Sequence, residues 1–213
     1  MAADDAPLVA AVDDAAYGEQ LLAWLLALAA GLQRPLSLVV VESVAALGAA
    51  ALPATQVLPH GGATWQPLRR DDVELGFRAQ AARLQAALAR AAHGGAAPAS
   101  LRVVRGSLVE CSHALWAETN LLVLACAPWV TAWPPAPGRR HPPRVALLPD
   151  GDHEGDGAQA RAAAVAARLA QALGAAGLAA VSAGPVPAPD LLVMARRAPD
   201  SALLRRGPLL LVG

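Results

Sequence analysis

Short apolar runs alternate along this chain with longer segments that are apolar on one face only. Uninterrupted apolar runs bounded by turn residues are typical of buried strands. The predicted strands occupy 8–12, 36–41, 101–104, 121–125, 145–148, 178–181, 191–194 and 209–212. Helical patterns lie between most of them, at 17–32, 71–93, 108–118 and 158–173, with a short one at 201–205.

This order of elements predicts the fold class. Strands that are separated by helices are joined by right-handed crossovers, which makes neighbouring strands parallel and covers both faces of the sheet. We therefore expect an α/β protein with an open, twisted, mainly parallel sheet that is flanked by helices, as in Rossmann-like folds.

Two segments interrupt the alternation. Residues 43–70 are rich in proline and glycine and predict a long irregular loop with a helical turn in its alanine-rich start. Asp71 or Asp72 is expected to cap the helix that follows. Residues 127–143 contain six prolines in a short span and indicate a linker or a tethered loop.

After the second interruption the pattern begins again. The order of strand, aspartate, helix and strand over 8–41 returns over 145–181, and the run 120–125 is echoed by 190–195. The echo predicts a degenerate tandem repeat with a shortened second half, divided as 1–140 and 141–213. The proline-rich stretch allows the run 145–148 either to complete the first sheet or to begin a second one.

Composition narrows the function classes. The formal net charge is zero and the chain has no lysine, which argues against a general nucleic-acid surface. The apolar run 21–32 is shorter than the roughly 20 residues that cross a bilayer, so no membrane insertion is expected. Cys111 and Cys126 are too few for a disulfide framework and are expected to be buried thiols in a reducing, cytoplasmic setting.

The sequence lacks the common catalytic motifs. It has no Walker A loop, no Gly-x-Gly-x-x-Gly fingerprint and no Gly-x-Ser-x-Gly elbow. Cys111 and His113 are two residues apart, so on a helix their side chains diverge. We predict no catalytic residue and no enzymatic activity.

One acidic cluster could suggest a metal site. Alternating acidic residues and glycines faintly resemble a calcium loop, but the closing glutamate of that loop is absent. A solvated loop without a metal is therefore expected. The cluster consists of Asp150, Asp152, His153, Glu154 and Asp156.

Two polar turns follow predicted strands. Asp13 and Asp14 stand at the carboxyl end of the first strand, the edge where open α/β sheets bind ligands. An aspartate there can also cap the next helix. Gly106 and Ser107 can likewise present amides to an anion, or Ser107 can serve as an N-cap. Both interpretations stay open for both turns.

Several of these segments together resemble the universal stress protein family. They are the Val12-Asp13 strand end, the turn 104–108, the run 190–194 and the closing run 207–212. The resemblance implies that Asp13, the amide edge at Val41, Gly106 and Ser107 lie at a nucleotide site, with ATP as a possible ligand. The family's glycine motif after the fourth strand is missing, because Cys126 is followed by Ala-Pro-Trp. This departure implies a member that lost phosphate binding of the usual kind.

Tryptophans and arginine pairs are the remaining candidates. Trp116, Trp129 and Trp133 suggest either an interface or core filling in a chain with only 3% aromatic residues. The pairs 139–140 and 205–206 are arginines and are expected to be solvated, although either pair could hold an anion.

The sequence as a whole favours a non-catalytic binding module that acts by association. Its partner would be itself, as a homodimer or a pseudo-dimer of its two halves, or another protein. One alternative is a nucleotide-binding protein that retains Asp13. A second is an α/β enzyme whose site lies in the segment 43–70.

Overall fold

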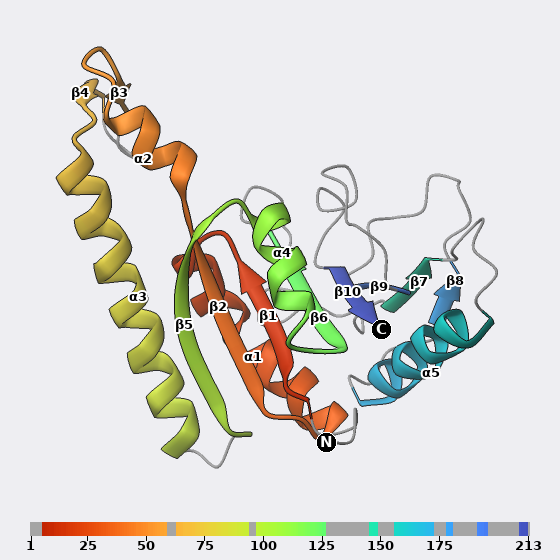
Figure 1. Ribbon diagram of the computed structural model, residues 1–213. Helices are drawn as coiled ribbons and strands as arrows, with labels where there is room; N and C mark the ends of the chain where they lie inside the picture. Colours follow the sequence, from red (N-terminus) through yellow and green to blue (C-terminus); the bar gives the residue numbers. More distant parts are fainter. Residues whose placement is uncertain are drawn as a thin grey trace.

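The computed structural model of this chain is a twisted sheet with helices packed along it (Figure 1). It describes residues 6–58, 63–93, 97–126, 145–148, 156–172, 178–180, 191–195 and 209–212. Within these residues, eight strands form one sheet and two short strands form a separate pair. The predicted α/β, mainly parallel, Rossmann-like architecture is confirmed.

The elements alternate as the apolar pattern predicts. As far as Cys126 they are β1 (Leu8–Val12), α1 (Ala15–Leu32), β2 (Leu36–Ser43), α2 (Val44–Ala50), β3 (Gln56–Val57), β4 (Gln66–Pro67), α3 (Arg70–His93), β5 (Ala99–Gly106), α4 (Leu108–Trp116) and β6 (Leu121–Ala125). Beyond it the described elements are β7 (Val145–Leu148), α5 (Asp156–Ala172), β8 (Leu178–Ala180), β9 (Leu191–Ala195) and β10 (Leu209–Val212).

The strand order of the sheet is β5-β2-β1-β6-β10-β9-β7-β8. Every described pairing in it is parallel except the one between β6 and β10, which is antiparallel. Strand β7 lies between β9 and β8, away from β1. The run 145–148 therefore belongs with the later strands, within a sheet that is continuous with the earlier ones.

Side chains alternate between the two faces of the sheet, and both faces are covered. Leu8, Ala10 and Val12 of β1 join a core cluster with α1, α3 and α5, whereas Val9 and Ala11 join a second cluster with α4. All five residues of β1 are buried as a result. A parallel strand that is covered on both sides reads as a continuous apolar run, which is why the sequence pattern located it.

Helix α1 is a core helix. Leu21, Leu25 and Leu28 lie on one face and are fully buried against the sheet. This spacing of four and three residues places a stripe of leucines toward the core. Among the described residues, no helix is long and apolar enough to cross a membrane.

The segment 43–70 is more ordered than the sequence suggested. Its alanine-rich start forms α2, where the side chain of Ser43 accepts a hydrogen bond from the amide of Ala46 at 3.2 Å and caps the helix. Strands β3 and β4 then pair with each other. The expected helical turn is confirmed, and the rest of the described segment is irregular apart from the two short strands, whose pairing satisfies the backbone locally.

Two other predictions need correction. Helix α3 begins at Arg70, so Asp71 and Asp72 lie in its first turn and do not occupy the N-cap; there they favour the helix through its dipole. Strand β5 is longer than the predicted run 101–104, because it pairs with β2 from Ala99 to Gly106. The predicted helix 201–205 and the proline-rich segment 127–143 lie outside the described residues.

Candidate functional site

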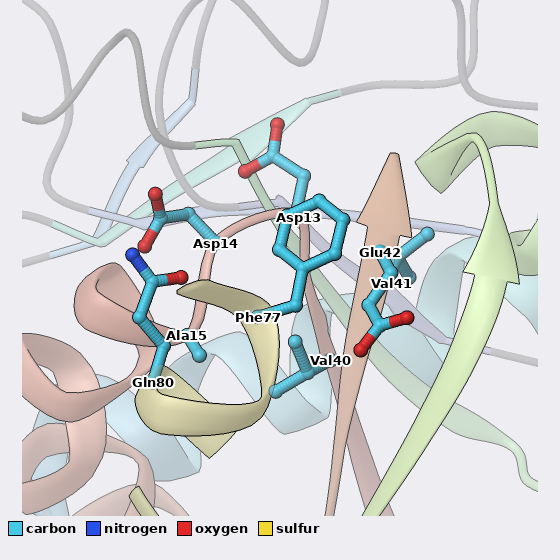
Figure 2. A pocket seen from close by; sticks show the side chains of 8 residues that line it. All are labelled: Asp13, Asp14, Ala15, Val40, Val41, Glu42, Phe77 and Gln80. Atoms are coloured by element: carbon cyan, nitrogen blue, oxygen red, sulfur yellow. The ribbon is translucent and has the colours of Figure 1, made fainter. Parts of the chain in front are cut away.

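A small pocket opens at the carboxyl ends of β1 and β2, where the sequence predicted a ligand edge. Residues from the β1–α1 turn, the start of α1, β2 and α3 surround it (Figure 2). The residues that line it are Asp13, Asp14, Ala15, Val40, Val41, Glu42, Phe77 and Gln80. Of the four residues implied as nucleotide ligands, Asp13 and Val41 line this pocket, whereas Gly106 and Ser107 do not.

The pocket is small for a ligand site. Its volume is about 20 Å³, which is close to the space that one water molecule needs. Pockets for small molecules and cofactors usually span roughly 300–1,000 Å³. The described residues therefore outline a hollow of about the size of one water molecule.

The two aspartates at the end of β1 have different partners. Asp14 Oδ1 accepts a hydrogen bond from the amide of Ala16 at 2.6 Å, so Asp14 caps α1. Asp13 Oδ2 accepts a hydrogen bond from Cys126 Sγ at 2.7 Å. The capping interpretation is thus confirmed for Asp14, while Asp13 is held by the residue that follows the neighbouring strand β6.

Glu42 is a buried charge at the end of β2 that the sequence reasoning missed. It is only 8% exposed, and its Oε2 accepts a hydrogen bond from Nε of Arg105 at 3.0 Å. Nη2 of Arg105 also lies 4.0 Å from Oε1 of Glu74. A charged residue at the end of an apolar strand requires a partner. The need for a partner could have drawn attention to Glu42 in the sequence. Only the pairing of β2 with β5 identifies Arg105 as that partner.

Phe77 and Gln80 were also missed, because they belong to a helix that is distant in sequence. Figure 2 shows both side chains reaching from α3 toward the ends of β1 and β2. The same view shows the carboxylates of Asp13 and Glu42 pointing in different directions. Within the described residues, no group of three acidic, histidine or cysteine side chains could hold a metal ion.

The turn between β5 and α4 is a complete capping box. Ser107 Oγ accepts from the amide of Glu110 at 3.2 Å, and the Glu110 carboxylate accepts from the Ser107 amide at 3.2 Å and from Ser107 Oγ at 2.8 Å. These bonds satisfy the groups that would have met an anion. The N-cap interpretation of Ser107 is confirmed.

Gly106 is required by close packing at this turn. Its φ angle is 158°, and a Cβ atom there would lie 2.9 Å from Cys111 Sγ. Cys111 therefore packs directly against the backbone at Gly106. A side chain at this position would push the sulfur away, and the glycine has a structural role independent of any phosphate.

Both cysteines are half-buried, so the expectation of buried thiols is met only in part. Cys126 reaches the edge of the sheet to contact Asp13, and Cys111 packs over the β5–α4 turn. Burial raises the pKa of the Cys111 thiol, and the neighbouring Glu110 carboxylate raises it further. A nucleophilic cysteine needs a lowered pKa, so this environment disfavours reactivity. His113 is exposed.

The remaining candidates divide between core and undescribed segments. Trp116 is buried in the cluster under α4, as expected for core filling. Trp129, Trp133, both arginine pairs and the acidic cluster from Asp150 to Glu154 lie outside the described residues, as does the side chain of Asp156. No protein-family model matches this chain, and no curated protein matches it either.

Proposed function

We propose that this chain is a non-catalytic binding module, a degenerate tandem protein of the universal stress protein type that acts by association. The observation that carries the proposal is the state of the ligand edge. Asp13, Asp14, Glu42 and Ser107 each engage a partner within the protein. The hollow that Asp13, Asp14 and Glu42 line together is only about 20 Å³.

The arrangement of the strands supports the tandem interpretation. Strand β7 lies between β8 and β9 and is parallel to both, as β1 lies between β2 and β6. In both groups the first residue of the central strand faces the first residue of each neighbour. These are also the strands that echo each other in the sequence. The antiparallel contact between β6 and β10 would then join the halves as a pseudo-dimer.

The charges at the pocket favour association over nucleotide binding. Three carboxylates, those of Asp13, Asp14 and Glu42, line it. These negatively charged carboxylates repel the negatively charged phosphates of a nucleotide. Arg105, a cation at this edge, is engaged by Glu42.

The enzyme alternative has little chemistry to draw on. The sequence from Val44 to Leu68 contains no Asp, Glu, Lys or Arg, so it offers few groups for acid–base work. The proposal also includes a reducing, cytoplasmic location, which is supported by Cys111 and Cys126 both being thiols and not a disulfide.

A thermal-shift experiment with the full chain tests the proposal. ATP, ADP and AMP at millimolar concentration with Mg²⁺ are expected to leave the melting temperature unchanged. A ligand at a hundred times its dissociation constant would add about 2.7 kcal/mol of apparent stability. A nucleotide-dependent shift that Asp13→Ala abolishes would overturn the proposal in favour of the nucleotide-binding alternative.

The tandem part has a separate test. A fragment of residues 1–140 lacks β10, so it exposes the edge of β6 and the apolar side chains that β10 covers. Unpaired apolar edges promote aggregation. We expect the fragment to associate or to lose circular dichroism, whereas the full chain stays folded. A stable, monomeric fragment would argue against a pseudo-dimer.

A further inference from the structure

An arm of the molecule carries most of the exposed large apolar side chains. We define the arm as residues 44–58 and 63–76, which form α2, β3, β4 and the first turns of α3. Figure 1 shows it at one end of the molecule, beyond the strands of the sheet. In the described part of the chain, only Val103 is a large, exposed apolar residue outside the arm. The exposed apolar residues of the arm are Val44, Leu52, Val57, Leu58, Trp65 and Leu75.

The degree of exposure is high for these side chains. Trp65 is 61% exposed and Leu75 is 65% exposed. The fully buried residues of α3, Leu84 and Leu88, both lie in its second half. Isolated exposed leucines are ordinary, but an apolar group gathered on one projection marks an interaction surface.

Two glycines in the helices of the arm provide an independent observation. Gly48 in α2 and Gly76 in α3 are both exposed, and a Cβ atom at either one would meet no other atom within 4 Å. Glycine inside a helix is less favourable than alanine, and alanine is the commonest residue in the described helices. Internal packing does not require either glycine. Close approach of a partner's backbone does give a reason for both.

The charges of the arm determine which partner fits. No Asp, Glu, Lys or Arg occurs from Val44 to Leu68, and this stretch is followed by Arg69, Arg70, Asp71 and Asp72. A neutral surface can meet an identical surface without burying or repelling a charge. Arg70 pairs with Glu74 at 3.3 Å within its own helix, so in a twofold arrangement Arg69 is the border cation that can face an anion of the other copy. A nucleic acid or an anionic lipid surface would instead require an excess of basic residues.

We propose that the exposed apolar surface of the arm is the contact between two copies of this chain, related by a twofold axis. The inference rests on the proposed function in one respect, since it names a partner for a module that acts by association. Strands β6 and β10 take no part in it. The contact between copies is therefore distinct from the contact that would join the two halves of one chain.

Light scattering after size exclusion, with the full chain over micromolar concentrations, tests this contact. The wild-type chain is expected to have the mass of two chains. Trp65→Ser removes the most exposed aromatic side chain of the arm, and Gly76→Gln places a bulky helix-forming side chain where the partner approaches. Each variant is expected to halve the mass. Val103→Ser, an exposed apolar position outside the arm, is the matched control and should keep the mass of two chains.

The outcomes separate this inference from its alternatives. At dilutions that dissociate the wild-type dimer, Gly76→Gln should melt at the same temperature as the wild-type chain or higher, because glutamine favours the helix. Loss of mass then reflects lost contact and not unfolding. A wild-type chain with the mass of one copy overturns the inference, as does a dimer that both arm variants leave intact. Flotation with phosphatidylglycerol vesicles that depends on Trp65 would assign the arm to lipid and would also overturn it. A nucleotide-dependent thermal shift contradicts the proposed function alone.

Discussion

Cys126 Sγ lies 2.7 Å from Asp13 Oδ2 and donates a hydrogen bond to that carboxylate. The two residues follow the paired ends of adjacent parallel strands, where Val12 of β1 faces Ala125 of β6. The bond therefore ties together the edge at which a sheet of this kind usually binds ligands. It engages the aspartate that the sequence singled out most clearly.

Replacing Cys126 tests the strength of this bond. We expect Cys126→Ala to lower the free energy of unfolding by about 1 kcal/mol, because the Asp13 carboxylate loses a donor. Cys126→Ser keeps a donor at the same position and should lose less. Urea denaturation measures both. Equal losses for the two variants would show that packing of the sulfur, and not the hydrogen bond, is what stabilises this edge.

The ion pair between Glu42 and Arg105 should couple β2 to β5. Glu42 is buried while the side chain of Arg105 is 54% exposed, so solvent weakens the pair. A double-mutant cycle with Glu42→Gln and Arg105→Gln is expected to give a coupling free energy of about 1 kcal/mol. A similar cycle on the exposed pair Arg102 and Glu118 should give less. A coupling near zero for the first pair would contradict its assigned role.

Ser107 is expected to act through the helix that it caps. Ser107→Ala removes the hydroxyl that accepts from Glu110 and should lower the free energy of unfolding by about 1 kcal/mol. Ser107→Thr retains the hydroxyl and serves as the control. Thermal or urea unfolding measures the difference. If Thr and Ala destabilise α4 equally, the capping box is not the source of the stability.

Cys111 should make stability fall at alkaline pH. Its raised pKa means that the native state keeps a proton which the unfolded chain has already lost. The contribution is therefore complete below the ordinary pKa of a thiol and is lost as the pH rises through the raised native value. Urea denaturation at increasing pH should show this decrease, and Cys111→Ala should reduce it.

Alkylation provides a second measurement of the raised pKa of Cys111. At pH 8, iodoacetamide should modify Cys111 of the folded chain more slowly than the same thiol in the urea-unfolded chain, because the thiolate fraction is smaller. Cys126→Ala simplifies the measurement by leaving one thiol. Faster reaction in the folded state would contradict the direction of the pKa shift.

Much of the fold could be predicted from the sequence, because burial on both faces makes a parallel strand apolar throughout. Strands β1, β6, β7 and β10 begin and end at their predicted residues for this reason. Helix starts were harder to predict, since several polar residues compete for one cap. Asp71 and Asp72 were both plausible caps of α3, yet the helix begins before them at Arg70.

The candidate site depended more on tertiary structure. A periodic pattern reports local burial, but the partner of a polar group comes from whichever strand lies alongside. Asp13 and its partner Cys126 are 113 residues apart in sequence, and Glu42 and Arg105 are 63 residues apart. The periodicity of apolar residues carries no information about pairs so distant in sequence.

The sequence by itself determined the α/β alternation, the acidic turn at the end of the first strand and the echo between the two halves. Only the tertiary structure decided that Asp14 caps α1 while Asp13 meets Cys126, that β10 runs antiparallel to β6, and that the arm exposes its apolar side chains. The physical reason is the range of the forces involved. Helix and strand periodicity arise from neighbours in sequence, whereas strand order, ion pairing and exposure depend on how distant segments pack.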